Sequence, residues 1–150
     1  MSYLVQQDIQ DELGGVDKLI QLTDEDGSGT VGVARVQNAI DFASGTFDSY
    51  ARTRYQIPVP TTPMVRTLCL DLACWQLVKS RTSIDEGRYK VRKDAYELAM
   101  KRLADIQSGK AALDVPTIQE TATNPAAADE TLRGSSASPP VFSDDKLSSY

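Results

Sequence analysis

The sequence contains no histidine. Without an imidazole side chain, Ser-His-Asp and Cys-His catalysis, histidine-ligated zinc and a histidine-based pH switch are all excluded. The sequence also has no phosphate-binding glycine loop, no Cys-x-x-Cys pair and no glycosidase-like pair of carboxylates. We therefore predict that the protein is not an enzyme, has no catalytic residues and uses no cofactor.

Cysteine is nearly as scarce, with only Cys69 and Cys74 in the chain. Two cysteines are too few for a disulfide framework. Five residues apart on a helix, their side chains point about 140° away from each other, too far to form a bridge. We expect both to be reduced, buried small apolar side chains.

Long apolar runs are also missing. No stretch of about 18 apolar residues occurs, and the first residues, Met-Ser-Tyr-Leu-Val-Gln-Gln-Asp, form neither a basic nor an apolar leader. We expect no membrane contact, and a protein that stays in the cytoplasm where it is made unless an assembly carries it out.

What is present is the composition of a soluble globular protein, with 150 residues of which 41% are hydrophobic and 25% charged. The predicted fold is all-α, a small helical bundle with an extended C-terminal arm. Two short helices are predicted over residues 3–13 and 16–22, and three long helices over residues 33–55, 64–81 and 85–107. Apolar residues recur at helical spacing in the first long helix: Val33, Val36, Ile40, Ala43, Phe47 and Tyr50.

The predicted helix ends depend on capping residues and prolines. Thr30 is expected to cap the first long helix, Thr62 with Pro63 in the first turn the second, and Ser83 or Asp85 the third. Gly109 is expected to end the last helix. We expect the centre of the core to be formed by Phe47, Leu72, Trp75 and Tyr96, with Tyr89 on the buried stripe of the last helix.

The chain changes character after Pro116, which predicts two parts: a helical body over residues 1–116 and an arm over residues 117–150. The arm is rich in Thr, Ala, Ser, Pro and Asp, a composition typical of an extended or disordered segment. Apolar residues return only at its tip, and we interpret them as a docking site for a partner: Val141, Phe142, Leu147 and Tyr150. A chance apolar cluster on a free tail remains the alternative.

The net charge of −5 is unevenly distributed. Residues 1–48 carry nine acids and two bases, for −7. Residues 49–116 carry twelve bases and seven acids, for +5, and residues 117–150 carry five acids and two bases, for −3. A monomer that folds these segments together is one interpretation, and head-to-tail assembly of subunits is the other. The candidate interface or channel charges are Asp41, Asp48, Arg52, Arg54, Arg88 and Arg92.

Residues 24–31 partly match a calcium-binding loop. Asp24, Asp26 and Ser28 occupy its first, third and fifth positions. The twelfth position, where such a loop needs a bidentate glutamate, is Arg35. We therefore favour an ordinary turn and assign no metal site.

A basic run between Arg81 and Lys93 is a candidate nucleic-acid patch. The chain has a pI near 4.7 and no recognisable motif for reading DNA bases. Both observations weigh against sequence-specific DNA binding. A small DNA-binding or calcium-responsive regulatory module is kept as the alternative function.

Several segments together resemble a known family. They are Tyr3-Leu4, Asp8-Ile9, Gln21-Leu22-Thr23-Asp24, Ala39-Ile40-Asp41, Ala43-Ser44, Asp48-Ser49-Tyr50, Arg54-Tyr55, Pro58, Asp71-Leu72-Ala73, Arg81, Tyr89, Leu103 and Gly109-Lys110. From about residue 3 to residue 113, the chain is similar to the Mu-like tailed-phage family of small helical head-completion proteins, the head–tail connectors or adaptors. Its densest stretch is residues 39–58, and the closing Val141-Phe142-Ser143-Asp144-Asp145 is similar to the short aromatic motif at the end of such proteins.

This resemblance implies a structural virion protein at the head–tail junction, or neck. It implies a dodecameric ring below the portal that continues the DNA channel. Its implied partners are further copies of the chain, the portal protein, a stopper or tail-completion protein, and DNA that passes without sequence-specific binding. Assembly would take place in the host cytoplasm.

Overall fold

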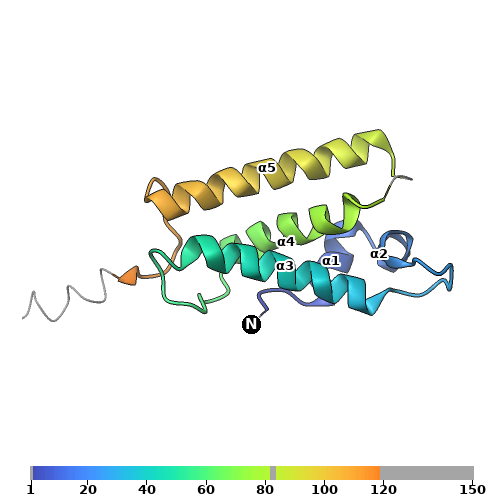
Figure 1. Ribbon diagram of the computed structural model, residues 1–150, viewed down its shortest axis with the longest axis horizontal. Coiled ribbons are helices and arrows are strands. Elements are labelled where there is room, and N and C mark those ends of the chain that lie inside the picture. The colour runs from blue at the N-terminus through green and yellow to red at the C-terminus, as the bar shows by residue number, and fades with distance from the viewer. Residues whose placement is uncertain (1, 82–83, 119–150) are drawn as a thin grey trace, which may run out of the picture. The chain divides into compact units, whose positions relative to one another are not determined.

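The computed structural model describes residues 2–81 and 84–118. These residues form five helices and no strand, which confirms the predicted all-α bundle (Figure 1). The helices are α1 (Gln6–Leu13), α2 (Val16–Thr23), α3 (Val33–Ala51), α4 (Pro63–Val78) and α5 (Glu86–Ser108).

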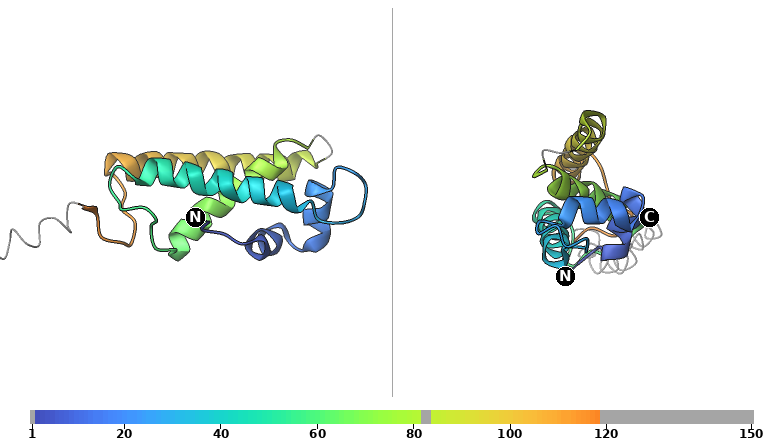
Figure 2. Two further views of the ribbon diagram at one scale, coloured as in Figure 1. Left: turned by 60° about the horizontal axis from the view of Figure 1, so that its bottom comes forward. Right: turned by 90° about the vertical axis from the view of Figure 1, so that its right-hand side faces the viewer.

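The three long helices contact one another in pairs and form the body, with α4 against both α3 and α5. The short helices α1 and α2 pack on each other and cover the end of the body where α3 begins and α4 ends (Figures 1 and 2). None of these helices is long and apolar enough to cross a membrane.

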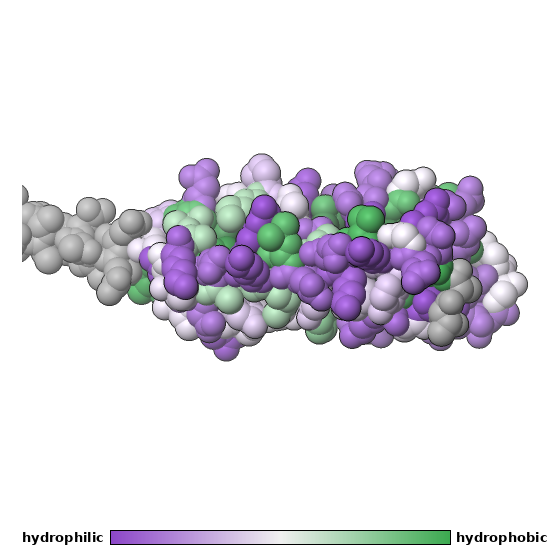
Figure 3. All heavy atoms as spheres, turned by 90° about the horizontal axis from the view of Figure 1, so that it is seen from above, coloured by the Kyte–Doolittle hydropathy of each residue, from purple (hydrophilic) through white to green (hydrophobic). Residues whose placement is uncertain are grey.

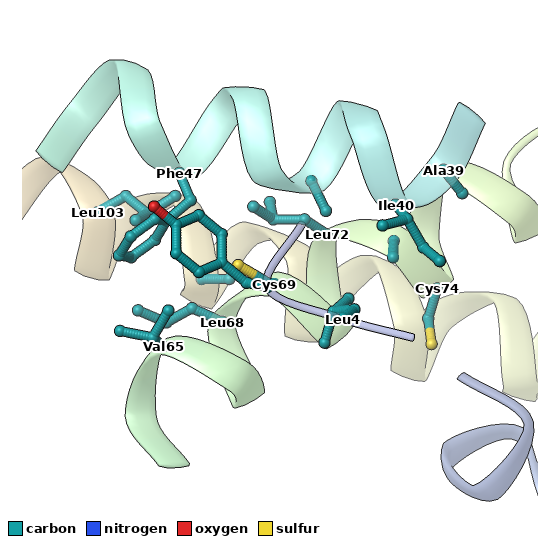
Figure 4. Close-up of a cluster of buried hydrophobic side chains, with 14 of the residues drawn as sticks. Leu4, Ala39, Ile40, Phe47, Val65, Leu68, Cys69, Leu72, Cys74 and Leu103 are labelled. Carbon is teal, nitrogen blue, oxygen red and sulfur yellow. The ribbon is translucent and has the colours of Figure 1, made fainter. Parts of the chain in front are cut away.

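The core lies between α3 and α4 and continues to the C-terminal half of α5 (Figure 4). Phe47 and Leu72 are fully buried at its centre, as expected, and Cys69 and Cys74 are free, buried thiols. Leu4, from the segment before α1, also points into this cluster.

The prediction that Trp75 and Tyr96 lie at the centre is wrong, because both are only half-buried. Trp75 instead packs against Tyr96 and Tyr89 on the flank of the body, with ring centroids 5.6 and 5.2 Å apart respectively. Tyr89 keeps 37% of its surface exposed. The buried residues of α5 are Ala99, Leu103 and Ile106, so its first half lies at the margin of the core.

Most predicted caps are confirmed. The Thr62 hydroxyl accepts a hydrogen bond from the Val65 amide, and Pro63 occupies the first turn of α4. Asp85 caps α5, and Gly109 ends it in the left-handed conformation that favours glycine. Thr30 is not a cap, since Gly32 is the residue before α3.

The predicted bounds of three helices need correction. The first helix begins at Gln6 rather than residue 3, because Tyr3 is held in the preceding extended segment by hydrogen bonds to α3. α3 ends at Ala51, since the following turn brings Tyr55 into the core. α4 ends at Val78. Arg81, three residues later, donates a hydrogen bond to the Leu22 carbonyl near the C-terminal end of α2.

The chain divides into two units, Met1–Val115 and Pro116–Tyr150. The arm itself stays a prediction, because residues 119–150 are outside the described part of the chain.

Candidate assembly surfaces

Neither cysteine is placed for nucleophilic chemistry. Burial raises the pKa of both the Cys69 and the Cys74 thiol to about 12, so that both are protonated at neutral pH. Within residues 2–81 and 84–118, no cluster of three or more acidic or cysteine side chains is close enough to hold a metal ion.

In the calcium-like loop, residues 24–31, the Asp24 side chain accepts hydrogen bonds from the backbone of the same loop. One carboxylate oxygen of Asp24 accepts from the Gly29 amide at 2.7 Å, and the other from the Ser28 amide at 3.0 Å. These amide donors lower the pKa of Asp24. The Asp24 carboxylate is thus held by backbone amides of its own loop, four and five residues further along the chain.

Two arginines attach this loop to the body. The Arg81 guanidinium donates to the carbonyls of Leu22 and Asp24, at 3.0 and 2.7 Å, and thereby caps the C-terminal end of α2. Arg35 contacts the Glu25 carboxylate and the Ser80 hydroxyl. The loop is thus tied to the start of α3 and to the residues just after α4.

Thr23 and Gly32 bring the two sides of the loop together. The Thr23 hydroxyl donates to the Leu19 carbonyl and accepts from the Gly32 amide. A Cβ atom at Gly32 would lie only 2.4 Å from the Thr23 carbonyl oxygen. This close approach requires glycine at position 32.

Tyr3 joins the N-terminal segment to α3 and to the loop before α4. Its hydroxyl donates to the Asp48 carboxylate and accepts from the Val59 amide at 3.2 Å. Burial and the bond to Asp48 raise the pKa of Tyr3, so the phenol stays protonated. Asp48, a predicted interface charge, is therefore bonded within the subunit.

Arg54 and Tyr55 hold the last segment of the first unit. The Tyr55 hydroxyl, buried in the core, accepts from the Leu113 amide at 2.8 Å. Arg54 donates to the carbonyls of Ile106 and Ala111, each at 3.4 Å. Arg54 and Tyr55 thus fix the residues just before the predicted arm. Both belong to residues 39–58, where the sequence resemblance is densest.

The six predicted charge candidates fall into two groups. Asp48, Arg54 and Arg92 make contacts within the subunit, the last with the carboxylate and carbonyl oxygens of Glu12. Asp41, Arg52 and Arg88 are exposed at separate places, on α3, just after α3 and on α5, and the bonds of Asp41 and Arg52 are local ones to Gln37 and the Asp48 carbonyl. The structure does not bring the six together into one site.

The predicted docking residues, Val141, Phe142, Leu147 and Tyr150, lie outside the described residues.

A polar cluster that the sequence did not reveal lies where α1, α4 and α5 meet. Asp71 on α4 is half-buried there, and its pKa is raised chiefly by burial and secondly by the negative charge of Glu12. Arg92 and Arg102 partly offset this effect. No periodicity marks such a residue, since its neighbours come from three different helices.

A groove of about 1050 Å³ lies beside this cluster, between the α1–α2 turn, the end of α4 and the start of α5. Its apolar lining includes Leu13, Leu22, Val78 and Val91, and its basic lining includes Lys18 and Arg88.

Comparison with known proteins identifies what the chain is similar to. The profile of the family described as "Bacteriophage Mu, Gp36" matches residues 3–131. The "Mu-like prophage FluMu protein gp36" of Haemophilus influenzae (strain ATCC 51907 / DSM 11121 / KW20 / Rd) is 35% identical over 89 residues, which cover 59% of each chain. The matched region thus spans less than two thirds of that relative.

Proposed function

The chain belongs to the Bacteriophage Mu Gp36 family, and from this premise we propose that it is a structural virion protein, a head–tail connector (adaptor) subunit. In this proposal it forms a ring below the portal, links the capsid to the tail and continues the DNA channel. The observation that carries the proposal is the family match itself, which spans the whole helical body, together with the resemblance of residues 39–58 to head-completion proteins.

The charge distribution supports head-to-tail contacts between subunits. Five bases are exposed along α5: Arg88, Lys90, Lys93, Lys101 and Arg102. The first 48 residues, which form α1, α2 and most of α3, carry a net charge of −7. In a ring, the basic helix of one subunit would meet the acidic helices of the next, as heterologous interfaces allow.

The contacts of Arg54 and Tyr55 support a role for the arm. A docking arm needs a fixed origin, and these two residues hold the segment that ends at Val115. The arm would order on assembly, and burial of Phe142, Leu147 and Tyr150 would offset its loss of conformational entropy.

The proposed partners are further copies of the chain in a dodecameric ring, the portal protein and a stopper or tail-completion protein. The ring would sit at the neck of the virion after assembly in the host cytoplasm. DNA would pass through it without sequence-specific binding, past channel walls formed by the acidic segments. A density map of the neck with Arg88, Arg92 and Lys101 lining the channel would reverse this orientation.

Deletion of residues 139–150 tests the docking role. The truncated subunit should remain folded and soluble but should no longer complete heads, measured as infectious particles in a complementation assay. A control deletion of residues 121–132 shortens the arm equally and keeps its tip. Infectious particles from the tip deletion would contradict the docking role.

The alternative functions make different predictions. A DNA-binding module would show salt-sensitive affinity for DNA in the isolated subunit, whereas a connector should show weak affinity. A calcium-responsive module would show a heat of calcium binding, and Arg35 at the twelfth position of the loop predicts none.

A further inference from the structure

The groove beside α5 has an apolar lining that the body leaves uncovered. Val91 is 64% exposed, and Leu98, two turns further along the same side of α5, is 50% exposed. Seen from above α5, apolar side chains emerge between the polar ones along this helix (Figure 3). The groove thus has an apolar lining, and a second exposed apolar side chain, Leu98, lies beyond it on the same side of α5.

The charges of the groove leave a positive excess. Arg92 is paired with Glu12, and the Asp85 carboxylate is turned toward the Arg88 amide as the cap of α5. Lys18 and Arg88 have no acidic partner within the described residues. A ligand that fits this groove should therefore be apolar and carry negative charge.

We propose that this groove receives the tip of the arm, residues 139–150, of a neighbouring copy of the chain. The inference rests on the proposed ring and names the surface that the tip contacts. Val141 and Phe142 supply the apolar side chains, and the adjacent Asp144 and Asp145 supply the negative charge for Lys18 and Arg88.

The arm is long enough for this contact. Residues 116–140, fully extended, span up to about 80 Å, whereas α5, the longest helix described, spans about 35 Å. An arm of that length can reach past the body of its own subunit to a neighbouring one. In a ring, such contacts would link each subunit to the next by a second connection.

Disulfide trapping between two single variants of the full chain tests the contact. One variant carries Val91→Cys in the groove and the other carries Phe142→Cys in the tip. Because Cys69 and Cys74 are buried, the introduced thiols are the accessible ones. We expect a dimer band on non-reducing electrophoresis when the two variants are mixed.

The matched control replaces Val91→Cys by Lys93→Cys. Lys93 is also exposed, but two residues along α5 it points about 200° around the helix, away from the groove. The mixed dimer should be lost with this control. An equal yield from both positions would overturn the assignment.

A charge swap gives an independent readout. Arg88→Glu in the groove variant should reduce the yield of dimer, and Asp144→Arg in the tip variant should restore it. No dimer from the mixture, or a cross-link found only within single chains of a Val91→Cys/Phe142→Cys double variant, would overturn docking on a neighbour. Rings of wild-type chain bound to the portal would leave the proposed function standing in that case.

Discussion

The hydroxyl of Tyr55, in the turn after α3, accepts a hydrogen bond of 2.8 Å from the backbone amide of Leu113, 58 residues later in the chain. Both residues are buried. This bond fixes the segment after α5 to the end of α3, immediately before the boundary of the first unit.

Tyr55→Phe should therefore leave the Leu113 amide buried without an acceptor. We expect a loss of about 1–3 kcal/mol in the free energy of unfolding. Urea denaturation measures that loss, and hydrogen exchange should show faster exchange at Leu113. Tyr50→Phe is the control, because the half-buried Tyr50 hydroxyl makes no hydrogen bond among the described residues. Equal stability of the two variants would contradict the role of this bond.

The two glycines near and within α3 should respond oppositely to alanine. Gly32→Ala places a Cβ atom 2.4 Å from the Thr23 carbonyl oxygen, so the loop must shift. We expect a loss of roughly 1–3 kcal/mol, the usual cost of overpacking. Gly45 lies exposed inside α3 with nothing within 4 Å of a Cβ atom, so Gly45→Ala should gain about 0.5–1 kcal/mol. Melting temperatures that move in the same direction would contradict this account.

Asp71 predicts a pH dependence of stability. Its pKa is raised above 3.8 in the folded state, so at a pH between the unfolded and the folded pKa the folded chain holds a proton that the unfolded chain has lost. Stability from this group therefore falls as pH rises from about 3.8 through the folded pKa.

Asp71→Asn removes this pH-dependent loss of stability, because the asparagine side chain is neutral. At pH 7 the variant should be more stable than wild type by less than about 1 kcal/mol, as expected for a partly exposed charge. The gain should shrink as the pH approaches 4. Urea denaturation across this range measures it, with the exposed Asp94→Asn as the control. A variant less stable than wild type at pH 7 would show that the pairing of Asp71 with Arg92 and Arg102 outweighs its burial.

The helices were predictable from sequence because apolar spacing, prolines and caps are local signals. Thr62 and Pro63 marked the start of α4, and Gly109 marked the end of α5. The start of α1 was not predictable, since Tyr3 lies in an extended segment through hydrogen bonds to residues more than 40 positions away.

The position of the aromatic residues was not predictable for a related reason. Periodicity shows which face of α5 turns inward, but not that the core meets only its second half. Tyr89 and Tyr96 therefore lie on the flank with Trp75. The groove and the Asp71 cluster also depend on residues from several helices, so no single stretch of sequence carries their signal.

The most direct test of the connector proposal is electron microscopy of the full-length protein mixed with the portal protein of its own phage. The account predicts a closed ring of subunits, coaxial with the portal and open along its axis. Subunits that stay monomeric and leave the portal bare would contradict it.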